Sequence, residues 1–194
     1  MTGAPRVDLA TMLHKAVRKL LFEQAMLLAR SDFYSDDAVE LACDALDNTM
    51  LMLREHAEHE DIVVFPVLAE LDHLLASEAV RQHQALEQSM RDIERVAATL
   101  RLATRAERAR LGRDLTQRFN QFVAAQLTHL AFEEAELQPA LWLGKSDEEL
   151  LAMRGLIRGL LPEPRGKVWL ELLLTAADPA ERAAFRPPPE PLLA

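Results

Sequence analysis

Apolar residues recur every three or four positions along four long segments of the chain, which is the spacing of one buried helix face. The first segment follows Asp8, a residue type that caps helices, and ends near Ser31. The second begins at Asp36 or Asp37 and reaches Pro66, which we expect to kink or end the helix. Each segment predicts one long helix, and the polar turn between them is short.

Two more helices follow with the same periodicity. The third is predicted to begin near Ser77, and the fourth opens with Thr104 and Glu107 in the spacing of a capping box and continues towards Pro139. Because the connections are short, successive helices should run antiparallel. The predicted fold is therefore all-α, an up-down-up-down four-helix bundle over residues 1–142.

The rest of the chain, residues 143–194, predicts a C-terminal helical extension that packs on the bundle. Ser146 and Glu149 repeat the capping-box spacing at the start of one helix, and residues 167–177 predict another. The last ten residues, FRPPPEPLLA, are proline-rich and should be frayed or extended. Two tryptophans are expected to hold the extension in place, Trp142 and Trp169.

Composition supports a helical protein and excludes several classes of function. Leu (35) and Ala (30) make up a third of the chain, whereas the sheet-forming Val, Ile and Thr total 21. The net charge of −9 disfavours general nucleic-acid binding, which needs clustered positive charge. Neither a membrane span nor a secretion signal is visible, and the single cysteine, Cys43, allows no disulfide. We therefore expect a cytoplasmic protein that binds neither membranes nor nucleic acid.

The six histidines are the informative residues. Three of them are followed by glutamate four positions later, which places both side chains on one helix face: His56 with Glu60, His83 with Glu87, and His129 with Glu133. These three histidines and His14 also lie on the apolar stripes of the four predicted helices. Burying carboxylates on such stripes is costly unless a metal or another charge compensates them.

Distances along the helices put these groups at one level of the bundle. His14 and His56 lie roughly 24 and 27 Å from the turn that joins their helices, at about 1.5 Å per residue. His83 and His129 lie within about one helical turn of each other, counted from the turn at Thr104. The sequence thus predicts one layer of four imidazoles and three carboxylates: His14, His56, Glu60, His83, Glu87, His129 and Glu133.

This set of ligands suits a pair of iron ions with a bridging oxo or hydroxo group. Two ferrous ions bring four positive charges, and three glutamates with one hydroxide bring four negative charges, so the buried centre is neutral. Seven protein ligands leave coordination positions open for a small molecule. Zinc, manganese or a mixed pair can use the same ligands, so the native metal stays open.

Some of these residues have simpler interpretations. Glu87 can instead be an exposed glutamate that pairs with Arg91 one turn later. His59 lies beside the apolar stripe, which favours a surface role or a supporting role behind a ligand, and His73 is expected in an exposed turn. Five phenylalanines are expected in the core and as a dry wall around the site: Phe22, Phe65, Phe119, Phe122 and Phe132.

The segments around these residues resemble a known family. His14, the run HAEHEDIVVFP from His56, RQHQALE around His83 and HLAFEEAELQP from His129 look like the hemerythrin-like (HHE cation-binding) domain over roughly residues 8–142. The resemblance implies a four-helix bundle with a non-haem di-iron centre. It also implies that the four histidines are terminal iron ligands and that Glu60 and Glu133 bridge the two ions.

Two departures from the oxygen-carrying members bear on function. Those members have a histidine at the position of Glu87, and a longer-spaced aspartate at the position of Glu133. A site richer in carboxylate should favour ferric iron. Oxygen sensing, peroxide turnover, nitric oxide chemistry and iron handling are therefore as well supported here as reversible oxygen carriage.

Two functional hypotheses follow. In the first, the di-iron centre binds or reacts with O2, peroxide or NO at an open position. No nicotinamide or flavin motif is visible, so the electrons for turnover would come from an external donor. In the second, the chain is an iron- or oxygen-responsive regulatory or interaction module without turnover, and the extension carries the signal. Whether the protein is an enzyme stays open.

Overall fold

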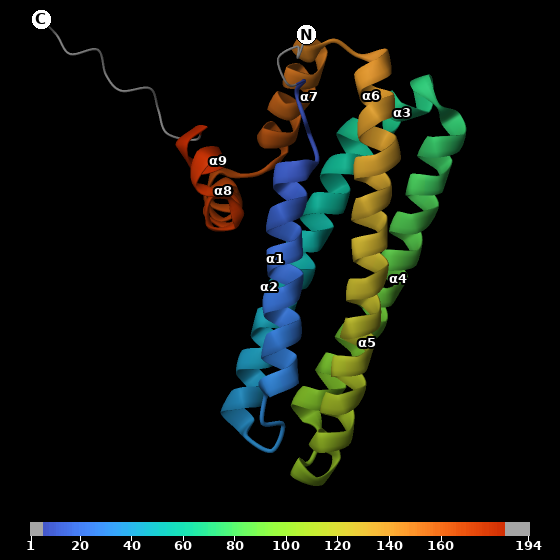
Figure 1. Ribbon diagram of the computed structural model, residues 1–194. Coiled ribbons are helices and arrows are strands. Elements are labelled where there is room, and N and C mark those ends of the chain that lie inside the picture. The colour runs from blue at the N-terminus through green and yellow to red at the C-terminus, as the bar shows by residue number, and fades with distance from the viewer. Residues whose placement is uncertain (1–5, 185–194) are drawn as a thin grey trace, which may run out of the picture.

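The computed structural model describes residues 6–184; every regular element in that range is helical, and none of these helices is both long and apolar enough to cross a membrane. Four long segments run side by side (Figure 1): α1 (Thr11–Arg30), α2 (Asp36–His59) with α3 (Phe65–Leu71), α4 (His73–Leu102), and α5 (Arg105–Phe132) with α6 (Gln138–Gly144). Helix α1 packs against α2 and α5, and α4 packs against the same two helices. This arrangement confirms the up-down-up-down bundle.

Side-chain caps set the helix starts. Asp8 accepts hydrogen bonds from the backbone N–H groups of Ala10 and Thr11, both at 2.8 Å, as expected of a cap. The cap of α2 is Ser35, which accepts from a backbone N–H at 3.3 Å, rather than Asp36 or Asp37. The two aspartates lie in the first turn instead, where their charge favours the helix dipole. The capping boxes at Thr104 and Ser146 are confirmed.

The chain stays helical beyond two prolines, Pro66, which was expected to kink or end its helix, and Pro139. Pro66 and Pro139 each follow a wide π-helical turn, η1 (Glu60–Val64) and η2 (Glu133–Leu137), which closes with a hydrogen bond across five residues. The wider turn makes room for a residue that has no N–H, so α2 continues through α3, and α5 continues through α6. Helix α4 also begins earlier than predicted, because Asp72 caps it by accepting the N–H of Leu75 at 3.0 Å.

The bundle core consists of two apolar clusters that lie on either side of the histidine layer. Phe119 and Phe122 belong to the larger cluster and Phe65 to the smaller one, whereas Phe132 packs half-buried against the smaller. The prediction for Phe22 is wrong. Its side chain is 49% exposed, because its position on α1 faces away from the neighbouring helices.

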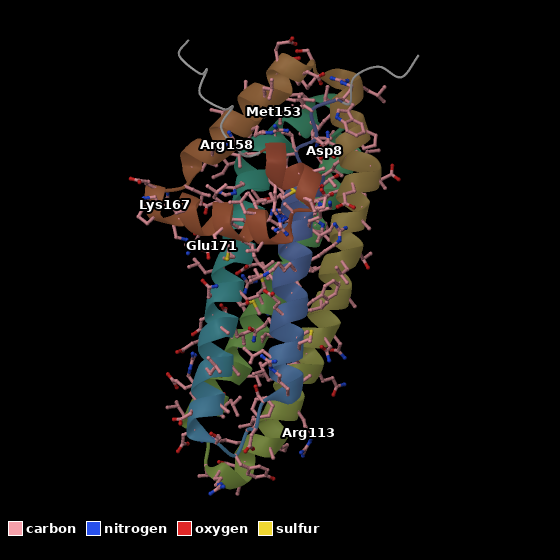
Figure 2. All side chains as sticks on the ribbon, turned by 60° about the vertical axis from the view of Figure 1, so that its left-hand side comes forward. Asp8, Arg113, Met153, Arg158, Lys167 and Glu171 are labelled. Carbon is pink, nitrogen blue, oxygen red and sulfur yellow. The ribbon has the colours of Figure 1, made fainter. Side chains whose placement is uncertain are left out.

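The extension consists of α7 (Asp147–Leu160), α8 (Glu163–Ala176) and α9 (Pro179–Ala184). Helix α7 packs on η1, and α8, marked by Lys167 and Glu171 in Figure 2, lies across α1. The buried Trp169 fixes α8 by donating to Glu55 of α2 at 2.8 Å. Trp142 donates to the carbonyl of Val7, which precedes α1, and packs with the apolar cluster that includes α7. The proline-rich end FRPPPEPLLA lies outside the described residues.

Candidate metal centre

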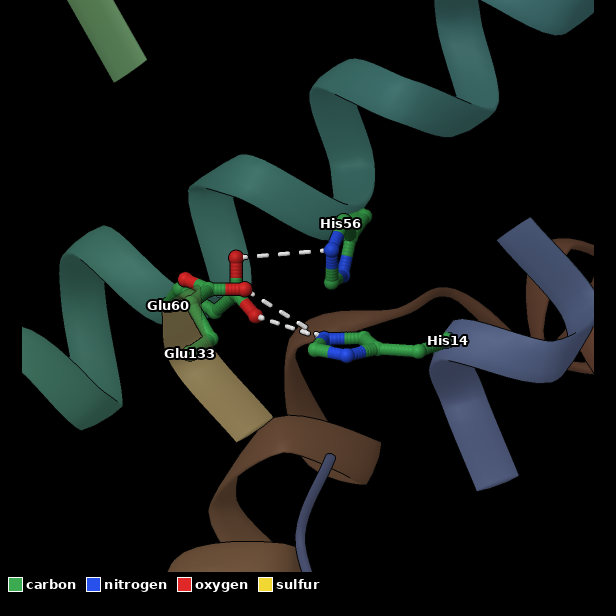
Figure 3. A group of neighbouring side chains, drawn as sticks. All are labelled: His14, His56, Glu60 and Glu133. Atoms are coloured by element: carbon green, nitrogen blue, oxygen red, sulfur yellow. Dashed lines mark ion pairs between the residues drawn. The ribbon is translucent and has the colours of Figure 1, made fainter. Parts of the chain in front are cut away.

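Six of the seven predicted ligands meet in one buried layer between the two apolar clusters. Six elements supply one residue each: His14 from α1, His56 from α2, Glu60 from η1, His83 from α4, His129 from α5 and Glu133 from η2. Each of the six residues is at most 9% exposed. Four of them are drawn in Figure 3, where the two glutamates point towards the imidazoles of α1 and α2.

The ligand atoms form two groups that share both glutamates. In each group, all ligand atoms lie within 4.8 Å of one another: His14 and His56 with Glu60 and Glu133, and His83 and His129 with the same two glutamates. The two oxygens of Glu60 lie 3.7 Å from His14 Nε2 and 3.4 Å from His83 Nε2. Those of Glu133 lie 3.3 Å from His14 Nε2 and 3.3 Å from His129 Nε2. Each carboxylate therefore reaches both groups, as a bridging ligand would.

Three of the four histidines are held from behind through Nδ1, so that Nε2 faces the centre. The pairs are His14 with Glu134 at 3.0 Å, His83 with Asp61 at 2.9 Å, and His129 with Gln82 at 3.0 Å. Glu134 is itself held by Arg18 through two hydrogen bonds, at 2.7 and 3.0 Å. Acceptors behind imidazoles are the usual support of metal-binding histidines.

These supporting acceptors were not predicted from the sequence. Each adjoins a ligand in the sequence: Asp61 follows Glu60, Glu134 follows Glu133, and Gln82 precedes His83. The placement of Arg18 one turn after His14 was a further signal. Proximity to a ligand along the chain could therefore have indicated them.

The contact between His83 and His129 requires a cation or a proton. Asp61 can only accept, and Gln82 donates its amide N–H to Glu78 at 2.8 Å, so its oxygen is the atom that faces His129. Both Nδ1 atoms are therefore donors, and in neutral imidazoles both Nε2 atoms carry lone pairs. These two lone pairs face each other across 3.0 Å. Two nitrogens bound to one ion at about 2.1 Å and at right angles lie about 3.0 Å apart.

The remaining polar atoms of the centre have no hydrogen-bond partner among residues 6–184. These atoms are His14 Nε2, both ring nitrogens of His56, Glu60 Oε2 and both carboxylate oxygens of Glu133. Orphaned buried polar groups are rare in native proteins because each one is costly. Nitrogen and oxygen atoms that converge in this way fit a bound cation, which would serve all of them.

Two histidines of the centre hold protons tightly when no cation competes. Burial alone lowers the pKa of a histidine, but the carboxylates of Glu133 and Glu60, 3.3 and 3.7 Å from Nε2, outweigh burial and raise the pKa of His14 to about 10. Burial likewise opposes the rise for His83, and the hydrogen bond to Asp61 and the nearby carboxylate of Glu60 raise its pKa to about 10. Protein prepared without metal therefore carries two imidazolium charges in this layer at pH 7.

Burial dominates the pKa values of His56, His129 and Glu133, whereas neighbouring histidines dominate that of Glu60. Burial lowers the pKa of His56 to about 4 and that of His129 to about 3, so both are neutral at pH 7. Burial and the nearby charge of Glu60 raise the pKa of Glu133 to about 7. The pKa of Glu60 lies well below its usual value, because the neighbouring histidines outweigh its burial.

Metal uptake should therefore release protons. His14 and His83, with pKa values of about 10, must each lose a proton before Nε2 can bind a cation. We expect about two to three protons released per chain at pH 7, because Glu133, with a pKa of about 7, is also partly protonated. Above that pKa, where only the two histidines release protons, the apparent affinity should rise about 100-fold per pH unit. Calorimetric titration with zinc in buffers of different ionisation enthalpy measures the number. Zinc binding without proton release would contradict this protonation of the cluster.

Glu87 does not reach the centre. Its carboxylate is 37% exposed and pairs with Arg91 at 3.1 Å and with Arg54 at 3.4 Å. Two guanidinium groups at the surface thus stabilise a charge that would otherwise have to be desolvated. The structure corrects the predicted ligand set here and agrees with the simpler interpretation of Glu87.

A feature of the sequence separates Glu87 from the other two glutamates. Glu60 and Glu133 each begin a π-helical turn, and each is followed six residues later by proline, Pro66 or Pro139. Six residues after Glu87 lies Ile93, and α4 stays a regular α-helix there. Single π-helical turns often occur at functional sites. The glutamates that reach the centre are therefore those with a wide turn and a following proline.

The other two histidines lie outside the ligand groups. His59 is buried, at 5% exposure, next to η1. His73 is exposed as predicted, although it is the first residue of α4 rather than part of a turn.

A groove of about 1030 Å³ between α2, α3 and α4 leads to the centre. His56 and His83 lie among its lining residues. Its apolar walls include Leu53, Phe65, Leu86 and Met90, and its charged residues include Arg54, Arg81 and Arg91. The groove therefore reaches two imidazoles of the layer.

Comparison with known proteins gives one match. The family model described as "Hemerythrin HHE cation binding domain" matches residues 7–141. The matched range includes all six residues of the centre and ends before α7. No match was found among the curated proteins or the solved structures.

Proposed function

The chain belongs to the hemerythrin HHE cation-binding family, and from this premise we propose that it is a non-haem di-iron protein that binds or reacts with O2, peroxide or NO. The observation that carries the proposal is the pair of ligand groups that share Glu60 and Glu133. Each group offers two imidazoles and two carboxylates, a donor set that suits iron. Four protein donors per ion leave coordination positions open.

The charge of the centre also supports two divalent ions. Without Glu87, the ligands bring only two negative charges, from Glu60 and Glu133. Asp61 and Glu134 bring two more, directly behind His83 and His14. These four negative charges balance the four positive charges of two ferrous ions. The positive charge of Arg18 and the negative charge of a bridging hydroxide would cancel each other.

The residues of the chain would divide the work as follows. The imidazoles bind through Nε2, and the acceptors at Nδ1 keep each ring in one tautomer and one orientation. Glu60 and Glu133 bridge the two positions. The apolar clusters above and below the layer exclude bulk water from it. Two iron ions held there would supply redox chemistry and open coordination positions, and an external donor would supply any electrons.

The groove between α2 and α4 would admit the small molecule. It brings solvent close to His56 and His83, and its apolar lining lets a neutral molecule approach. Its three arginines face acidic neighbours; for example, Arg54 binds Glu94 through two hydrogen bonds of 2.7 Å. The rim therefore carries little excess charge, which favours a small neutral ligand over a large anion.

An iron-responsive regulatory or interaction module is the second candidate, and the contacts of the extension favour it. Arg165 and Trp169 bind Glu55, which directly precedes His56, at 2.6 to 2.8 Å. Lys15, which directly follows His14, pairs with Glu181. Helices α8 and α9 thus both contact residues next to ligands, so a shift of those ligands on metal binding would move this part of the extension.

Anaerobic reconstitution with ferrous iron tests the proposal. We expect about two irons per chain, and after oxidation a visible absorption band of an oxo-bridged ferric pair that changes on addition of azide. Apoprotein that takes up no iron would end the proposal. Catalytic consumption of peroxide or O2 by the iron-loaded protein would favour the enzyme. Iron-dependent protection of the extension from proteolysis, without turnover, would favour the module.

A further inference from the structure

A second and much smaller cavity adjoins the two bridging glutamates. Its volume is about 30 Å³, and both Glu60 and Glu133 line it. The remaining wall comes from the start of α1, from His59, from α6 and from Ile157 of α7. One water needs about 10 to 15 Å³ of such volume, so the cavity suits water or a molecule of two heavy atoms.

Gln138 presents an unused hydrogen-bond donor at this cavity. The residue lines the cavity and is 3% exposed. Its Oε1 accepts the backbone N–H of Leu9 at 2.8 Å, which fixes the orientation of the amide. The NH2 group therefore cannot exchange places with the oxygen, and its Nε2 has no partner among residues 6–184. A buried donor of this kind is costly unless a ligand accepts from it.

The position of Gln138 is tied to the centre. Gln138 is the first residue of α6, and its backbone N–H donates to the carbonyl of Glu133, closing η2. The π-helical turn that begins at the bridging glutamate thus also sets the position of the amide. A donor and two carboxylate acceptors border the same small space.

We propose that this cavity is a holding site for hydrogen peroxide beside the centre. Peroxide has two heavy atoms, accepts a hydrogen bond through either oxygen and donates one through either hydroxyl group. One oxygen would accept from Gln138 Nε2, and a hydroxyl would donate to Glu133 or Glu60. O2 and NO donate no hydrogen bond and accept only weakly, so they make poorer use of these groups. The inference deepens the proposed function and rests on it for the reaction that would follow.

Crystals soaked in hydrogen peroxide test the site without turnover, when the protein carries redox-inert zinc or is used as purified. We expect two-atom density with one oxygen about 3 Å from Gln138 Nε2. Gln138→Leu should lose this density. Gln24→Leu is the matched control, because Gln24 is also 3% exposed and lies on α1 away from the cavity. Density for water alone, or an empty cavity, in soaked crystals would overturn the proposal.

A kinetic experiment gives a second readout if the iron-loaded protein consumes peroxide. Gln138→Leu should raise KM about fivefold to tenfold, the size expected of one hydrogen bond, and change kcat little. Gln24→Leu should leave both constants unchanged. An unchanged KM in Gln138→Leu would overturn the holding site while the di-iron proposal stood. Failure of the chain to bind iron would end the di-iron proposal. The crystal soak would still test the peroxide holding site in that case.

Discussion

Replacing Glu133 by alanine is expected to lower the iron content from about two ions per chain to one or fewer. Glu133 reaches both ligand groups, at 3.3 Å from His14 Nε2 and 3.3 Å from His129 Nε2, so its loss removes a ligand from each ion. Removal of a group that only supports a ligand weakens metal binding about 10- to 100-fold. Removal of a bridging ligand should therefore weaken metal binding by more than about 100-fold. Elemental analysis after anaerobic reconstitution measures the iron, and the oxo-bridge band should disappear.

Glu87→Ala is the matched control for this variant. Glu87 has the same spacing from a histidine as Glu133 but pairs with Arg91 and Arg54 at the surface. This variant should keep both irons and the full absorption band. Iron loss in Glu87→Ala equal to that in Glu133→Ala would show that the sequence pattern, rather than the observed geometry, selects the ligands.

The stability of metal-free Glu133→Ala shows whether a loss of iron comes from misfolding or from the missing ligand. Glu133 is a buried carboxylate whose pKa is raised to about 7, because burial and the charge of Glu60 disfavour its ionised form. Its removal relieves this buried charge but also takes a partner from the protonated His14, 3.3 Å away, so the metal-free variant should lose some stability and stay folded. Thermal unfolding of the metal-free variant, followed by circular dichroism, checks this. A large loss of stability without metal would mean that Glu133 also has a structural role.

Removal of the metal is expected to produce the second large effect, a marked loss of thermal stability. Ligand binding to the folded state alone stabilises it by about 4 kcal/mol for each ion present at about 1,000 times its Kd. Two ions would then add about 8 kcal/mol, and in a chain of this size about 2 to 4 °C of melting temperature accompany each kcal/mol. We expect the melting temperature to fall by about 15 to 30 °C after chelation, as followed by circular dichroism.

The pH dependence of this loss gives an internal check. The pKa values of His14 and His83 are raised to about 10, so their protonation stabilises the metal-free fold fully below about pH 6.5. That contribution is lost as the pH rises towards 10, whereas metal binding strengthens over the same range. The gap in melting temperature between metal-loaded and metal-free protein should therefore widen from pH 6 to pH 9. A gap that narrows would contradict the protonation of these two histidines.

Local sequence accounts for most of the helices and for the histidines of the centre. Helical periodicity placed His14, His56, His83 and His129 on buried stripes, and the rise of the helix placed them at one level. Both properties depend only on residue spacing, which is why the sequence could predict them. The capping boxes at Thr104 and Ser146 were equally local and were predicted correctly.

The prediction was wrong wherever the result depended on partners from other helices. Phe22 has the right residue type for the core, but no helix packs over its position on α1. Glu134 and Asp61, which fix His14 and His83, were not predicted either. Each lies beside a ligand along the chain but accepts from a histidine of another helix.

By itself, the sequence determined an all-helical bundle with a layer of imidazoles and carboxylates, because hydrophobic spacing and helix geometry act along the chain. The three histidine and glutamate pairs have the same four-residue spacing, and the tertiary structure decided which of them deliver their carboxylate inside. Glu60 and Glu133 face imidazoles from neighbouring helices, whereas Glu87 meets two arginines at the surface. A carboxylate lies where its charge is best compensated, and the compensating groups come from parts of the chain that are distant in sequence.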